Sequence, residues 1–126
     1  MKGVLIALVI LTLILAAVTA NALYIHRVTQ SLLDRLDALP LEPSPAELPR
    51  TVESIAAIRL DFEKESSLLG VTVLRSTLDR ITELFSLLEI QARTANLPAY
   101  SSTLILLRNL IKEMARLEQV GVENLL

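Results

Sequence analysis

The sequence predicts an all-α protein, in which an N-terminal transmembrane helix is followed by a small antiparallel three-helix bundle. One observation is an uncharged run of twenty-three residues between Lys2 and His26. Another is that apolar residues recur at spacings of three and four through most of the remaining chain, which is the period of an amphipathic helix. The composition agrees, because the chain of 126 residues contains three glycines, no tryptophan and only 3% aromatic residues.

The uncharged run is long enough to cross a membrane. A helix rises about 1.5 Å per residue, so twenty-three residues reach roughly 34 Å, against about 30 Å for the hydrocarbon core of a bilayer. Its few polar side chains include Thr12 and Thr19, and a threonine hydroxyl can bond to a carbonyl of its own helix. This run therefore predicts a membrane span.

Two interpretations of the run remain open. As an uncleaved signal anchor it keeps Met1 and Lys2 in the cytoplasm and exports the rest. As a cleaved signal peptide it offers a small-residue site at 20–22, Ala-Asn-Ala. Apolar residues continue past that site through Ile25, which favours the anchor. In both cases the remainder of the chain lies outside the cytoplasm.

The first unit is expected to span residues 1–39, as one long helix that projects beyond the membrane. An apolar stripe continues through its second half and ends just before Pro40, where a helix normally stops. The stripe consists of Ile25, Val28, Leu32, Leu36 and Leu39.

Residues 40–49 are expected to form a linker. They contain four of the five prolines in the chain, a composition typical of an extended polyproline spacer. Residues 44–47 resemble a helix start with a capping serine. Because Pro49 follows so closely, we expect only one short turn there.

The third unit, residues 50–126, is expected to be an extracytoplasmic helical bundle. Its first helix is predicted from about Arg50 to Leu69, and Gly70 then ends it. Without a reversal at Gly70, the apolar residues that follow would face the opposite side of the helix. The predicted inner face of this helix comprises Val52, Ile55, Ile58, Phe62 and Leu69.

The next predicted helix covers residues 71–95 and has the most regular pattern. Its stripe comprises Val71, Leu74, Leu78, Ile81, Phe85, Leu88, Ala92 and Ala95. Charged residues lie off the stripe, and Glu89 is spaced for an ion pair with Arg93. Residues 96–98 form a connector so short that an antiparallel return is expected.

The last predicted helix continues to about Glu118, followed by a tail, residues 120–126, that is expected to pack back. Its inner face comprises Tyr100, Leu104, Leu107, Ile111 and Met114. Further apolar residues widen this surface beyond one stripe, which is typical of a central helix or of one covered by another chain. The candidate partner or oligomer surface therefore consists of Ile105, Leu106, Leu110, Leu125 and Leu126.

No catalytic, cofactor-binding or metal-binding residues are assigned. The single histidine, His26, is expected at the lipid–water boundary, and no cysteine is present to supply a thiolate ligand. Two acid pairs, Asp61 with Glu65 and Asp79 with Glu83, share helical faces, but both faces are expected to be solvated. We therefore expect a protein that is not an enzyme.

Three segments carry a resemblance to a known family: Phe62, the run Leu78–Leu84, and the terminal run Val122–Leu126. On these residues the chain resembles a small bacterial family of membrane-anchored helical proteins known only as a domain of unknown function. The chain departs from that family by having Phe62 where tryptophan is common, by lacking a histidine near Ser76 and by its proline-rich linker. The resemblance implies a location and a shape, and no activity.

Eleven Lys and Arg residues and fourteen Asp and Glu residues follow His26, a net charge of −3, which disfavours nucleic acid as a partner. We expect a single-pass membrane protein that acts as a helical interaction or scaffold module. Its expected partners are the lipid bilayer and either another protein or further copies of itself, with no cofactor or small-molecule substrate. The alternatives are a secreted helical domain released by signal-peptide cleavage, and a single-pass sensory or membrane-active component.

Overall fold

The computed structural model describes residues 1–69 and 75–125, and within them every regular element is a helix. The predicted all-α class is confirmed. The four helices are α1 (Lys2–Asp37), α2 (Leu48–Leu69), α3 (Arg75–Arg93) and α4 (Leu97–Leu125).

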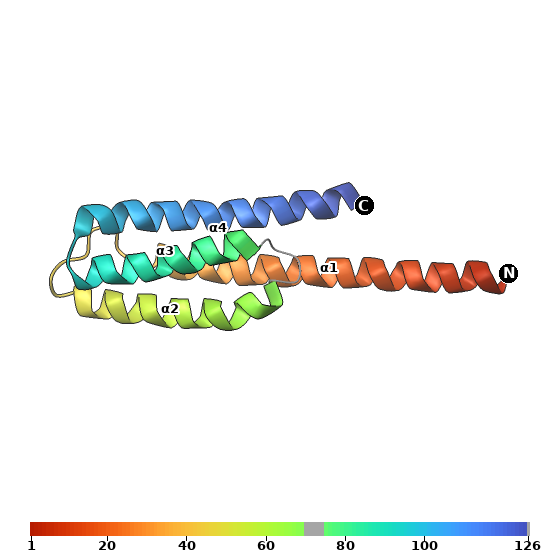
Figure 1. Ribbon diagram of the computed structural model, residues 1–126, viewed down its shortest axis with the longest axis horizontal. Coiled ribbons are helices and arrows are strands. Elements are labelled where there is room, and N and C mark those ends of the chain that lie inside the picture. The colour runs from red at the N-terminus through yellow and green to blue at the C-terminus, as the bar shows by residue number, and fades with distance from the viewer. Residues whose placement is uncertain (70–74, 126) are drawn as a thin grey trace.

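Helix α1 is much longer than the part of it that packs (Figure 1). Its second half lies in a bundle with the other helices, and its first half extends from the bundle as a single free helix. Contacts join α1 to α4, α4 to α3, and α3 to α2, and α1 meets α2 less extensively. In Figure 1 the chain runs one way along α1 and α3 and the opposite way along α2 and α4.

The second half of α1 is a full member of the core, so the core has four helices where the sequence predicted three. Ile25 and Leu36 are each only 1% exposed, and the remaining stripe residues are buried or half-buried. The sequence predicted the stripe correctly, but it did not predict which helix packs against it. An apolar stripe of this length must be covered, and α4 covers it.

Each of the other three predicted stripes also forms part of the core. At its centre the rings of Phe62 and Phe85 lie 5.6 Å apart at an angle of 36°, a tilted arrangement that aromatic pairs favour. The buried stripe residues of α2, α3 and α4 include Ile55, Ile58, Phe62, Leu69, Leu78, Ile81, Phe85, Leu88, Ala92, Tyr100, Leu104, Leu107, Ile111 and Met114.

The residues at the two ends of the predicted α3 stripe are not part of the observed core. Ala95, two residues after α3 ends, is exposed and has φ of 57°, in the left-handed region. The amide of Asn96 then donates to the carbonyl of Gln91 at 2.9 Å, closing the helix end. Val71 and Leu74 lie outside the described residues.

The proline-rich segment is not the extended spacer that was predicted. It turns back on the bundle, where Pro43 is buried. The hydroxyl of Tyr100 donates to the carbonyl of Pro40 at 3.0 Å, and Ser101 donates to the carbonyl of Leu41 at 2.5 Å. Burial raises the pKa of Tyr100 from its ordinary value of 10.0 to about 12. Partners sixty residues away thus hold the segment compact.

The short turn predicted at residues 44–47 leads directly into α2. The Ser44 amide donates to the Glu47 carboxylate at 3.1 Å, which holds the pKa of Glu47 below its usual value. The prediction that Pro49 would stop this turn is wrong, because Pro49 lies in the first turn of α2, where a backbone donor is not needed.

Helix α4 runs further than predicted, to Leu125 instead of about Glu118. Its only internal glycine, Gly121, weakens a helix without ending it. The tail therefore continues α4 as a helix and does not form a separate returning segment. The predicted packing of the tail side chains falls outside the described side chains.

Candidate functional site

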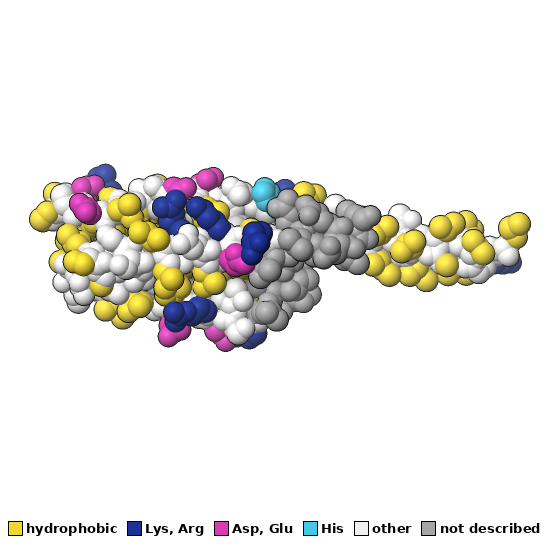
Figure 2. Space-filling model, turned by 90° about the horizontal axis from the view of Figure 1, so that it is seen from above, with side chains coloured by type: hydrophobic (Ala, Val, Ile, Leu, Met, Phe, Trp, Pro, Cys, Tyr) yellow, Lys and Arg dark blue, Asp and Glu magenta, His cyan; other side chains and the backbone are white. Residues whose placement is uncertain are grey.

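The first half of α1, which projects from the bundle, carries apolar side chains that no other part of the protein covers. Figure 2 shows hydrophobic side chains along this projecting end, and its large residues from Val4 to Ile14 are each more than half exposed. The one polar side chain within this stretch is that of Thr12, whose hydroxyl donates to the Leu8 carbonyl at 2.8 Å. By length and composition, α1 can span a membrane.

The candidate partner surface on α4 divides into two parts. Ile105 and Leu106 are 47% and 49% exposed, as a surface for a partner requires. Leu110 is half-buried and packs against the core, because it follows Leu107 by three residues and so lies at the edge of the inner face. Leu125 lies at the end of α4, with its side chain outside the described part of the structure, and Leu126 lies outside the described residues.

Sequence reasoning did not single out several other exposed apolar side chains of the bundle. Leu60 on α2 and Leu87 and Ile90 on α3 are 50%, 42% and 58% exposed. Each lies off its helix's inner stripe. That offset was readable from the sequence, but an isolated apolar residue on a solvated face is common and carries little information.

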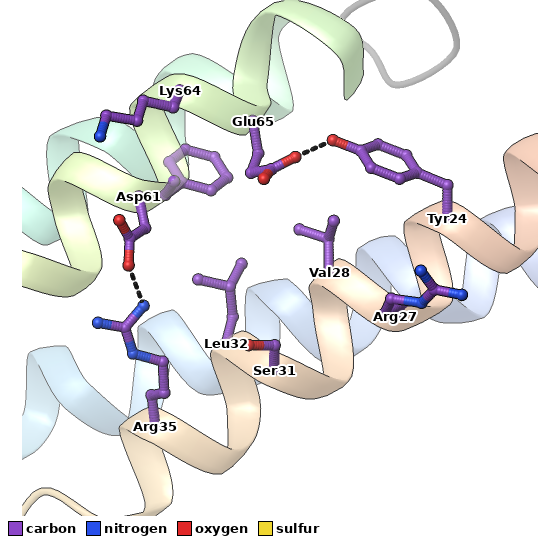
Figure 3. Close-up of a pocket in the computed structure, with 10 residues that line it drawn as sticks. Tyr24, Arg27, Val28, Ser31, Leu32, Arg35, Asp61, Lys64 and Glu65 are labelled. Atoms are coloured by element: carbon purple, nitrogen blue, oxygen red, sulfur yellow. Dashed lines mark hydrogen bonds and ion pairs between the residues drawn. The ribbon is translucent and has the colours of Figure 1, made fainter.

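A groove of about 400 Å³ lies between α1 and α2 (Figure 3). Two polar contacts cross it: the Tyr24 hydroxyl donates to the Glu65 carboxylate, and Arg35 forms an ion pair with Asp61 at 2.5 Å. Between these contacts the lining includes the apolar residues Val28, Leu32 and Phe62 and also Ser31. Sequence reasoning did not find this groove, because its walls come from helices whose contacting residues lie far apart in the chain.

The two acids of the first pair are engaged in the two polar contacts of the groove. Asp61 and Glu65 share a face of α2, but each carboxylate meets a different residue of α1. In the second pair, Asp79 faces Arg75 at 3.4 Å and Glu83 faces Arg80 at 3.3 Å.

His26 is exposed. Among the side chains that the structure describes, those of residues 1–67, 69 and 75–116, no three of His, Cys, Asp or Glu lie close enough to hold a metal ion.

Glu89 is a buried carboxylate that the sequence placed outside the core. Glu89 is 8% exposed. One of its carboxylate oxygens accepts from Arg59 of α2 at 3.1 Å, and the other accepts from Arg93 at 2.7 Å. The pairing with Arg93 was predicted; the pairing with Arg59 was not. Because both oxygens are engaged by arginines, one from α2 and one from α3, Glu89 links the two helices.

No family model, curated protein or solved structure matches this chain. The resemblance to a family of membrane-anchored helical proteins therefore stays a prediction, and the functional proposal depends on the chain's own geometry.

Proposed function

We propose that this protein is a single-pass membrane protein whose antiparallel helical bundle stands outside the cytoplasm and serves as a non-enzymatic interaction module. The observation that carries the proposal is the continuity of α1. One unbroken helix, Lys2–Asp37, is bare and apolar in its first half and part of the bundle core in its second. A helix of this kind attaches the bundle to the bilayer without a hinge.

In the orientation that we propose, Lys2 lies in the cytoplasm and the bundle lies outside it. Lys2 precedes the apolar run and Arg27 follows it. Basic residues that flank a membrane span favour the cytoplasmic side, and we assign Lys2 to that side. The folded part, with a net charge of −3 after His26, then lies on the outer side.

Ile105 and Leu106 supply the proposed contact surface for a protein partner or a second copy. They are adjacent and about half exposed, and they lie on α4, the helix that packs against α1. We expect Leu106→Glu to weaken self-association or partner retention by about tenfold or more, since a charge in an apolar contact costs at least ~1.4 kcal/mol. Sedimentation and crosslinking of the full chain in nanodiscs measure this.

The matched control for that variant is Leu60→Glu, which places the same charge at a similarly exposed position on α2. Circular dichroism should show that both variants remain helical. Equal association of the wild type and both variants would contradict the assignment of the contact surface to α4.

Two alternatives each have a specific observation in their favour. Cleavage after Ala22 would leave the core intact, because the first buried core residue is Ile25, so a secreted bundle is structurally feasible. A sensory role would use the same rigidity of α1, which can transmit a rotation or displacement between the membrane and the bundle. The mass of the mature protein separates the first alternative from the anchored form.

A further inference from the structure

Helix α3 packs against α2 on one flank and against α4 on the other. Glu89 identifies the α2 flank, because its carboxylate accepts from Arg59 of α2. Leu84 is only 2% exposed and lies about 140° round the helix from Glu89, so it identifies the α4 flank. Leu87 follows Leu84 by three residues and shares its side of the helix. Since Leu87 is 42% exposed, it projects from the surface where α3 meets α4.

The same reasoning places two adjacent residues of α4 on different surfaces. Arg108 identifies the flank of α4 that faces α1, because it pairs with Asp37 at 2.5 Å. Ile105 precedes Arg108 by three residues and so projects on the α1 side. Thr103 is buried and lies about 140° round the helix from Arg108, on the flank that faces α3. Leu106 follows Thr103 by three residues and is 49% exposed, so it projects where α4 meets α3.

Leu87 and Leu106 lie at nearly the same level of the bundle, and each has a charged residue two turns away. Leu87 lies eight residues before Ala95, in the connector, and Leu106 lies eleven residues after it. Because α3 and α4 are antiparallel (Figure 1), the two levels differ by about 4.5 Å. Arg80 lies seven residues before Leu87, and Glu113 lies seven residues after Leu106, each on the same side of its helix as the leucine. We call the surface formed by Leu87, Leu106, Arg80 and Glu113 the α3–α4 face.

The α3–α4 face is apolar around its leucines. Residues 84–88 of α3 and 97–107 of α4 contain no charged residue, and charged residues are depleted at the centres of protein interfaces. Leu110, four residues after Leu106, is half-buried and extends this apolar surface. The side chains of Arg80 and Glu113 are 54% and 49% exposed and border the surface on the side of the free half of α1.

The leucines and charges of the α3–α4 face are arranged so that a second copy of the chain complements them. Two copies anchored in one bilayer point the same way, so a two-fold axis that relates them lies along the membrane normal. The free half of α1 continues the direction of the bundle (Figure 1), so the helices run along that normal too. With the axis through the α3–α4 face, α3 of one copy lies against α4 of the other. Leu87 then meets Leu106 of the second copy. Two turns nearer the membrane, Arg80 meets Glu113 of the second copy, which has the opposite charge.

We propose that the α3–α4 face binds a second copy of this chain, so that the protein is a two-fold symmetric dimer in its membrane. This inference rests on the proposed function and narrows the contact surface to the side of α4 that carries Leu106. The leucines of both copies form one apolar cluster at the centre of the contact. The two pairs of Arg80 with Glu113 lie beside the cluster and fix the register of the two copies.

Cysteine crosslinking tests which surfaces meet, because the chain itself contains no cysteine. A Leu87→Cys copy and a differently tagged Leu106→Cys copy are expressed together, and their membranes are treated with a mild oxidant. A disulfide needs Cβ atoms within about 4.5 Å, so this pair should crosslink about tenfold faster than Leu87→Cys with Ile105→Cys. The second pair is the matched control, because Ile105 is adjacent to Leu106 and 47% exposed but lies on the α1 side.

Charge reversal tests the register. Arg80→Glu is expected to weaken self-association about fivefold, because it places like charges opposite each other twice in the dimer. Adding Glu113→Arg in the same chain restores opposite charges between the copies and should recover the wild-type level. Within one copy Arg80 pairs with Glu83, and Glu113 pairs with Arg116, so recovery reports on the contact between copies. Energy transfer between labelled copies in vesicles measures the association.

Equal crosslinking of the two cysteine pairs would overturn the α3–α4 face, and so would failure of the double charge reversal to recover association. A wild type that stays monomeric in the bilayer overturns the second copy as the partner and leaves the anchored module intact. Retention of the wild type after an alkaline wash is measured in parallel. Its release would contradict the anchorage, and the dimer geometry would fail with it.

Discussion

Phe62→Ala is expected to lower the free energy of unfolding of the bundle by about 3–5 kcal/mol. Phe62 is fully buried on α2 and packs against Phe85 of α3 at 5.6 Å. Truncation removes the transfer free energy of the ring and leaves a cavity at the junction of the helices. The ring also lines the groove against α1, so the loss affects two contacts of α2 at once.

Urea titration of the full chain in micelles, followed by circular dichroism, measures the effect. Leu60→Ala is the control, because Leu60 lies on the same helix and is 50% exposed; its cost should stay below about 1 kcal/mol. Similar decreases in the free energy of unfolding for the two variants would contradict the placement of Phe62 in the core.

Leu11→Arg is expected to reduce membrane insertion by about 100-fold, with little effect on the bundle. Leu11 lies near the middle of the apolar run and is 53% exposed, with no protein cover. An arginine at the centre of a membrane helix costs about 2.5–3.5 kcal/mol on insertion scales. Since Leu11 packs against nothing in the bundle, the helical core should form as in the wild type.

Fractionation and a glycosylation-site insertion assay quantify the inserted fraction, and thermal unfolding reports on the bundle. Gln30→Arg is the control, because it adds the same charge on α1 at an exposed position beyond the apolar run. Insertion of Leu11→Arg at the wild-type level would show that this part of α1 does not lie in hydrocarbon.

The inner faces of the helices could be read from the sequence because burial follows the helical period. Ile55 and Phe62 on α2, and Ile81 and Phe85 on α3, are all buried as their spacing predicts. The stripe that continues through α1 was equally readable. Its partner was not, since periodicity identifies a face without saying which helix covers it.

The proline-rich segment shows a second limit of prediction from the sequence. Local composition favours an extended spacer, yet Tyr100 and Ser101 bind the carbonyls of Pro40 and Leu41 across sixty residues. Tertiary hydrogen bonds of this kind override local preference. Pro49 was misjudged for a different reason, because its effect depends on whether it falls in the first turn of a helix or further inside.

The candidate site was predicted only in part. The exposure of Ile105 and Leu106 follows from their offset from the inner stripe, and Leu110 lies too near that stripe to be free. The groove depends on the contact between Tyr24 and Glu65, which are 41 residues apart. Only the folded arrangement of α1 and α2 brings them together.

The mass of the mature protein recovered from a washed membrane fraction tests the central proposal most directly. We predict the full chain of 13.9 kDa, retained with the membrane. A shorter, soluble product that begins near Leu23 would contradict the anchor.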